Sequence, residues 1–251
     1  MGWQWFHRLG SPRWFYDKSQ RWSLWLGLAA LLIIVPNLVW VLAFVPADFK
    51  QGNSFRIFYL HVPTSSLAMG GYYVMALCGA VSLIWKMKLA DMMMKCAAPM
   101  GAIFTFLALL TGGIWGKPTW GTYWLWDGRT TSTLMLFFLY MGVVAIQNAY
   151  QNQQMADKFS AILSLVGMVN IPIIYMSVNW WNTLHQPATI KILEPSTMHG
   201  SMLYPLFVMM IGFYFFYAWA LFKSVRVEIL RREHRTQWVR DIVVKNAVSV
   251  N

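Results

Sequence analysis

This chain of 251 residues is dominated by apolar side chains and contains few charges. Hydrophobic residues make up 58% of the sequence and charged residues 12%, whereas soluble domains typically contain about 25% charged residues. The composition excludes an ordinary soluble domain and indicates a protein that lies in a lipid bilayer. The net charge of +11 is then explained by loops that contact anionic lipid headgroups, and nucleic-acid binding is not expected.

Six apolar runs follow one another along the chain, each near the roughly 20 residues that cross a bilayer as a helix. They cover approximately residues 22–45, 60–85, 97–114, 131–150, 159–178 and 202–222. None of these runs contains Asp, Glu, Lys or Arg, so a charge relay inside the membrane is not expected. The sequence therefore predicts an all-α integral membrane protein with six transmembrane helices in a single domain, residues 1–251.

The basic residues are unequally divided between the two sides of this predicted bundle. The N-terminal segment 1–21, the second and fourth connections and the tail 223–251 contain 15 of the 20 Lys and Arg residues. By the positive-inside rule both termini are then cytoplasmic, and the first, third and fifth connections face outward. Residues 1–21 mix aromatic and basic side chains, which is typical of an amphipathic arm on the inner membrane surface. The alternating charges of the tail favour a solvated cytoplasmic helix.

The third connection, residues 115–130, is unusually rich in tryptophan. Its residues 115–127 read WGKPTWGTYWLWD and include Trp115, Trp120, Trp124 and Trp126. An indole offers a large flat apolar face and one N–H donor, so such a cluster at the membrane boundary favours a shelf for a flat amphipathic ligand such as a tetrapyrrole. Tryptophan is also enriched at membrane interfaces in general, but the Gly and Pro residues of this run indicate turns that a simple anchor does not require. A helical turn after Trp120 would place Trp120 and Trp124 on one face.

Two other motifs are absent from the sequence. The run from Gly112 to Lys117 misses the spacing of a phosphate-binding loop, and Pro118 occupies the Ser/Thr position, so no ATP site is predicted. The two cysteines, Cys78 and Cys96, form no C-x-x-C-H motif for covalent haem attachment.

Three of the five histidines, His61, His185 and His199, fall on the predicted outer side. Histidine readily offers a neutral nitrogen to a metal ion at ordinary pH. His61 begins the second span beside Pro63, and His185 follows a pair of tryptophans in the fifth connection. A histidine on each side of a flat ring is how proteins hold an iron porphyrin. Interfacial hydrogen bonding is the alternative for each histidine.

Charged residues near the outer side have two expected roles. Asp127, at the start of the fourth span, is expected to cap that helix or to join an ordering network. One or two of the outer cations are expected to neutralise porphyrin propionates, and the sequence does not select among them. These cations are Lys50, Arg56, Lys117, Arg129 and Lys191.

The tryptophan-rich run, the first connection from Pro46 to Ser54 and the histidine segments around His61 and His185 resemble the tryptophan-rich haem-handling protein family of cytochrome c maturation. The resemblance covers nearly the whole chain as far as Lys223. It implies that His61 and His185 are axial ligands of the iron and that the run Trp115–Asp127 is the platform for non-covalent haem b. It also implies that three residues of the first connection, Asp48, Gln51 and Arg56, dock a membrane-anchored periplasmic haem chaperone.

The resemblance further implies a bacterial inner-membrane protein that is not an enzyme. Its implied partners are a small single-span subunit and an ATP-binding cassette complex. Two other interpretations of the sequence remain open. A cytochrome b-like electron-transfer subunit places its histidines inside facing helices, and a haem or solute permease needs a polar or broken-helix path at mid-membrane, to which only Asn37 and Asn170 point.

Overall fold

The computed structural model describes residues 10–181, 183–185, 196 and 198–248, and within these ranges the chain is almost entirely helical. Six helical segments are long and apolar enough to cross a membrane, which confirms the predicted six-helix fold. The helices are α2 (Pro12–Ala43), the 3-10 helix η1 (Asn53–Ile57) continuing into α3 (Phe58–Trp85), α4 (Lys88–Trp120), α5 (Gly128–Ala149), α6 (Gln153–Gly167), α7 (Asn170–Trp180), α8 (Gly200–Arg232) and α9 (Gln237–Val248).

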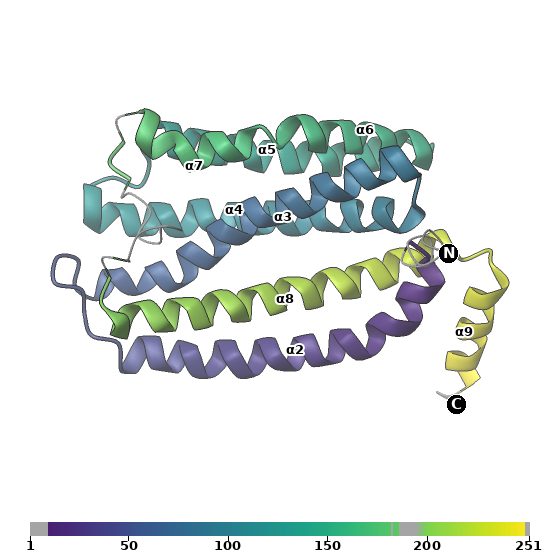
Figure 1. Cartoon of the computed structure of the whole chain (residues 1–251), viewed down its shortest axis with the longest axis horizontal. Helices are drawn as coiled ribbons and strands as arrows, with labels where there is room; N and C mark the ends of the chain where they lie inside the picture. Colours follow the sequence, from purple (N-terminus) through teal and green to yellow (C-terminus); the bar gives the residue numbers. More distant parts are fainter. Residues whose placement is uncertain (1–9, 182, 186–195, 197, 249–251) are drawn as a thin grey trace.

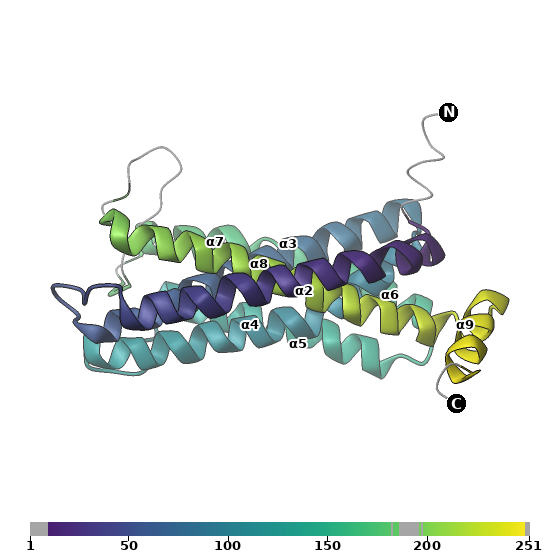
Figure 2. The ribbon, with the colours of Figure 1, turned by 90° about the horizontal axis from the view of Figure 1, so that it is seen from below.

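The antiparallel pair α3 and α4 forms the centre of the bundle (Figure 1). On one flank α2 packs against α8, and α8 contacts both central helices. On the other flank α5 packs against α4, α6 packs against α3, and α7 packs against α5. The first described residues and α9 lie at one end of the bundle, and the α2–α3 and α4–α5 connections lie at the opposite end (Figures 1 and 2).

Close packing at the centre depends on one tyrosine and one glycine. Tyr140, on α5, is fully buried, and its hydroxyl donates to the carbonyl of Ala68, on α3, at 2.8 Å. A Cβ atom at Gly101, on α4, would lie only 2.0 Å from Cζ of Tyr140. Small residues let membrane helices approach closely, so Gly101 provides the space in which Tyr140 joins α3, α4 and α5.

The fifth span is divided into α6 and α7 next to the Asn170-Ile171-Pro172 run. The two helices meet at Met168 and Val169. Proline has no N–H to donate, so it is tolerated in the first turn of α7. The Asn170 amide donates to the carbonyl of Ser132, on α5, at 2.9 Å, which fixes the break against the neighbouring helix.

The tryptophan-rich connection is shorter than predicted. Helix α4 continues past Pro118 to Trp120, and α5 begins at Gly128, so only residues 121–127 are non-helical. Trp120 and Trp124 therefore do not share a helical face. Proline removes one backbone hydrogen bond but does not end α4 here, because the last turn closes by a bond from the Gly121 N–H to the Lys117 carbonyl at 3.0 Å. Gly121 takes a left-handed conformation, with φ of 80°, that glycine adopts without strain.

The predicted N-terminal and C-terminal boundaries also differ from the helix boundaries. Residues 12–21 form the first turns of α2, and residues 1–9 of the predicted arm lie outside the described residues. Helix α8 continues ten residues into the predicted tail and ends at Arg232. Its charged end is not simply solvated, because Glu228 is buried and forms ion pairs with Lys95, Arg231 and Arg232.

Candidate functional site

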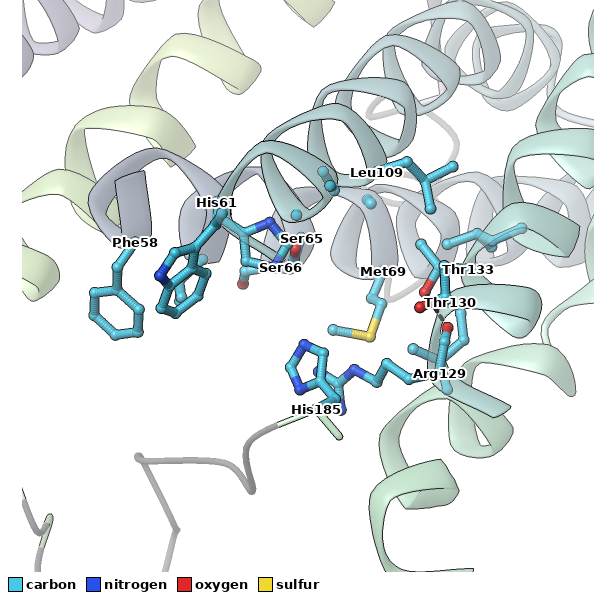
Figure 3. Close-up of a pocket in the computed structure, with 18 of the residues that line it drawn as sticks. Phe58, His61, Ser65, Ser66, Met69, Leu109, Arg129, Thr130, Thr133 and His185 are labelled. Carbon is cyan, nitrogen blue, oxygen red and sulfur yellow. Dashed lines mark hydrogen bonds between the residues drawn. The ribbon is translucent and has the colours of Figure 1, made fainter. Parts of the chain in front are cut away.

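A cavity of about 340 Å³ lies among the helices at the end of the bundle that holds the α4–α5 connection (Figure 3). This volume falls within the range of about 300–1,000 Å³ that is typical of small-molecule sites. Its walls come from α3, α4, α5, α7 and α8, together with the non-helical run 121–127 and His185. The predicted open shelf is thus a recess that reaches down between the helices to Ala68 and Leu136.

His61 lies in the first turn of α3 and lines this cavity. Its Nδ1 atom is 3.1 Å from Oγ1 of Thr111, on α4. The Thr111 hydroxyl donates its own proton to the Leu107 carbonyl at 2.6 Å, so its oxygen accepts from His61. This places the ring proton on Nδ1 and leaves the Nε2 lone pair available to a metal ion.

His185 reaches the same cavity from the segment that follows α7. Its ring centre is 6.4 Å from that of His61, with an angle of 39° between the ring planes. Two imidazoles that bind one metal ion from opposite sides, each through a bond of about 2.0–2.1 Å, have ring centres roughly 6.4 Å apart. The pair therefore has the separation of two axial ligands. Among the described residues no group of three or more His, Cys, Asp and Glu side chains is placed to hold a bare metal ion.

The four predicted tryptophans occupy different positions. Trp115 packs edge-on against His61, with ring centres 5.7 Å apart, and Trp120 lies 5.8 Å from His185. Trp115, Trp120 and Trp124 line the cavity. Trp126 is not among the lining residues, and 78% of it is exposed. The structure thus brings three of the four indoles together around the two histidines.

Two of the residues that line the cavity carry polar groups suited to a carboxylate. The indole N–H of Trp124 is buried and has no hydrogen-bond acceptor in the described structure. A buried donor without an acceptor costs free energy, and a ligand oxygen would remove that cost. Arg129, in the first turn of α5, also lines the cavity, and Figure 3 shows its side chain extending toward His185. Of the predicted outer cations that the structure describes, Arg129 alone lines this cavity.

Asp127 lies beside the cavity rather than in its wall. Its Oδ1 accepts from the Thr130 N–H at 2.8 Å, and it is the N-cap of α5. Its Oδ2 accepts a hydrogen bond from the hydroxyl of Thr183. Burial raises the pKa of Asp127, but these hydrogen bonds lower it by more, so the pKa lies below its usual value. Asp127 therefore combines the two expected roles, helix cap and member of an ordering network.

The predicted docking residues of the first connection make contacts within the chain. Asp48 accepts from the backbone N–H groups of Lys50 and Gln51 at 2.9 and 2.8 Å. The Gln51 side-chain oxygen accepts from the indole N–H of Trp115 at 2.7 Å, which links this connection to the cavity wall. The Arg56 guanidinium donates to the carbonyls of Leu42 and Val45 at the end of α2.

Two further candidates, His199 and Lys117, do not line the cavity. His199 caps the start of α8 by accepting from the Ser201 N–H at 3.3 Å. Lys117 donates to the Gly121 carbonyl at 3.0 Å and lies over the ring of Tyr123. Lys191 lies outside the described residues.

Sequence reasoning missed Thr111, Gly112 and Thr183. Thr111 precedes Trp115 by one helical turn, a spacing that places both on one face of α4 and offered a signal. A Cβ atom at Gly112 would lie 2.9 Å from Cε1 of His61, so glycine makes room for the ring. No pattern in the sequence points to Thr183, because its partner Asp127 is distant along the chain.

The two polar residues that pointed to a mid-membrane path are used in packing. The Asn37 amide, on α2, donates to the carbonyl of Pro205, on α8, at 2.9 Å, and Asn170 bonds to α5 as described above. Neither lines the cavity. Their amide N–H groups therefore join helices.

Comparison with known proteins places the chain in a family. Residues 5–240 match the family model described as Heme exporter protein C. Proteins of that name from Haemophilus influenzae and Escherichia coli K12 are 43% and 42% identical to this chain, over 95% and 97% of it and 97% and 98% of their own lengths. A putative cytochrome c biosynthesis ccmC-like mitochondrial protein from Marchantia polymorpha is 45% identical over 70% of this chain and 73% of its own. The chain thus belongs to the heme exporter protein C family.

Proposed function

We propose that this chain binds haem b non-covalently in the cavity and delivers it to a periplasmic haem chaperone for cytochrome c maturation. The observation that most supports this is the approach of His61 and His185, 6.4 Å between ring centres, across one cavity lined by indoles. A haem iron brings its equatorial nitrogens with it and takes only its axial ligands from protein. Two imidazoles at this separation would supply the two axial ligands, and the apolar cavity walls suit the porphyrin ring.

The polar groups of the cavity suit the carboxylate edge of haem. Arg129 supplies a positive charge, and the Trp124 N–H supplies a buried donor in need of an acceptor. Charge-assisted hydrogen bonds to carboxylates are roughly twice as strong as neutral ones. A haem whose iron lies between the histidines and whose propionates reach toward α5 would use both kinds of group.

The distribution of basic residues supports the orientation in the bacterial inner membrane. The described N-terminal and C-terminal ends lie together at the end of the bundle opposite the cavity (Figure 1). This is the end with most of the Lys and Arg residues, and the positive-inside rule assigns it to the cytoplasm. The haem site then faces the periplasm, where a chaperone can receive the cargo.

Handover requires a contact with the acceptor, and we assign it to the first connection. This connection lies at the cavity end of the bundle, and its Gln51 holds Trp115 of the cavity wall. Asp48 and Arg56 shape it through bonds to the backbone. A membrane-anchored haem chaperone bound here would contact a segment that supports the haem site. The complete exporter also includes a small single-span subunit and an ATP-binding cassette complex, and this chain itself binds and transfers haem without a catalytic step.

The test is the visible absorption spectrum of the purified protein. His61→Ala and His185→Ala should each change the spectrum of the bound haem, because an axial ligand is lost. His199→Ala is the matched control, since His199 caps α8 away from the cavity. A correctly inserted wild-type protein that stays colourless when haem is abundant would contradict the proposal, as would equal effects of all three substitutions.

A further inference from the structure

We infer that Thr183 is a positioning residue: its hydroxyl ties the backbone of His185 to the carboxylate of Asp127 and so holds the imidazole in the cavity. This inference rests on the proposed haem site. Thr183 lies in the segment after α7, and the segment has no regular secondary structure there. A ligand on such a segment needs support from a rigid element to keep its geometry.

The Thr183 hydroxyl forms two hydrogen bonds, one as a donor and one as an acceptor. It donates its single proton to Oδ2 of Asp127 and accepts from the backbone N–H of His185 at 3.0 Å. A hydroxyl has one proton and two lone pairs, so both bonds form at once. The link runs from α5, through Asp127 and Thr183, to the backbone of the histidine itself.

Asp127 is a firm anchor for this link. Its other oxygen accepts from the Thr130 N–H at 2.8 Å in the first turn of α5. A carboxylate is favoured at this position by the dipole of the helix. Each oxygen thus has its own partner, one on the helix and one on the segment that bears His185.

A second contact fixes the same segment nearby. Trp181, the C-cap of α7, packs onto Gly128, the first residue of α5. A Cβ atom at Gly128 would lie 2.9 Å from Cε3 of Trp181, so a larger residue would push the indole away. The segment is therefore held on the start of α5 before and at Thr183, which leaves His185 little freedom to leave the cavity.

Loss of the link should loosen His185 without removing it. Residues that orient a metal ligand typically contribute about 10–100-fold to metal affinity. Thr183→Val keeps the shape of the side chain but has no hydroxyl, so the affinity for haem should fall about 10-fold or more. Thr183→Ser keeps the hydroxyl and should retain the wild-type affinity for haem and the wild-type spectrum.

A measurement without haem separates this inference from the proposed function. Leu184 is 59% exposed, and a spin label at Leu184→Cys, with Cys78→Ser and Cys96→Ser, reports the mobility of the segment. In haem-free protein Thr183→Val should make the label more mobile, and Thr183→Ser should not. Asp127→Ser is a second variant: serine retains an N-cap oxygen for the Thr130 N–H but lacks the second oxygen, so it should also mobilise the label.

The outcomes are distinct. A mobile label in Thr183→Val and Asp127→Ser but not in Thr183→Ser supports the positioning role, even if the wild-type protein proves to bind no haem and the proposed function fails. Equal mobility of all variants and the wild type overturns the role. Equal behaviour of Thr183→Ser and Thr183→Val also overturns it, because the hydroxyl would then not be the cause. If Thr183→Val does not yield folded protein by size-exclusion chromatography, the comparison of Asp127→Ser with Thr183→Ser decides.

Discussion

Trp126 packs edge-on against Trp124, with ring centres 5.3 Å apart, yet only Trp124 lines the cavity. The two indoles lie two residues apart in the non-helical run 121–127, and 78% of Trp126 is exposed at the surface. The pair therefore offers a matched comparison of an indole at the proposed haem site with an indole beside it.

Trp124→Phe should weaken haem binding, whereas Trp126→Phe should leave it nearly unchanged. Phenylalanine keeps an aromatic face but has no N–H, so the substitution removes the buried indole donor from which a haem carboxylate would accept in the proposed complex. One hydrogen bond to a charged group is worth about 1.5–3 kcal/mol, which corresponds to roughly 10-fold or more in affinity. Haem titration of the purified variants measures the difference. Equal losses of haem affinity in the two variants would show that the N–H of Trp124 does not contribute specifically to haem binding.

Gly112→Ala should disturb the haem spectrum while the protein remains folded. The new Cβ atom would lie 2.9 Å from Cε1 of His61, so the imidazole ring has to move. Its Nε2 atom then no longer points toward the iron. Absorption spectroscopy detects the change. Gly142→Ala is the control, because its Cβ atom would meet the end of the Leu163 side chain at 3.0 Å, away from the cavity. A shifted spectrum in Gly142→Ala, or none in Gly112→Ala, would refute this explanation.

The sequence predicted the number of spans well and their ends poorly. A hydrophobic run of bilayer length requires a helix, because backbone groups in lipid have no water to bond. The same requirement does not stop the helix at the end of the run. Helix α4 continues through Pro118, and α8 continues to Arg232, because local hydrogen bonds and ion pairs satisfy the polar groups there.

The candidate site was predictable as a set of residues but not as an arrangement. Alternation of the spans puts His61, His185 and the tryptophans on one side, and this follows from the sequence alone. Their approach to one cavity depends on how α5 and α7 pack against the central helices, which no short motif encodes. The same holds for the choice of Arg129 among the outer cations and for the link through Thr183.

The stability provided by the Asp127 carboxylate should depend on pH. Its pKa is below the usual value in the folded protein, so its contribution is complete well above the unfolded pKa of about 3.9 and is lost as the pH falls through the folded pKa. Asp127→Asn keeps a capping oxygen and does not titrate, and it serves as the reference. The unfolding temperature of the wild type should exceed that of the variant at pH 6, and the gap should close toward pH 3. A gap that is constant with pH would contradict the assignment.

The ion cluster at the opposite end should govern stability without affecting haem. Arg232, on α8, donates to both oxygens of Asp157, on α6, at 2.8 and 3.1 Å, and their side chains are only 11% and 9% exposed. Removing one partner of a buried pair costs up to about 3–5 kcal/mol when the other charge is left unpaired. Arg232 keeps a second partner in Glu228, so the loss of Asp157 should cost less than this but more than the loss of an exposed pair. Asp157→Ala should therefore lower the midpoint of unfolding clearly. Among the described residues, Glu233→Ala breaks the ion pair with Lys88, whose side chain is 71% exposed, and surface pairs are worth about 0–1 kcal/mol. Chemical denaturation in detergent compares the two variants.

The haem spectrum of both variants should match that of the wild type, because the cluster lies far from the cavity. Equal stabilities of the two variants would contradict the role of the buried pair, and a changed haem spectrum in Asp157→Ala would show that the two ends of the bundle are coupled.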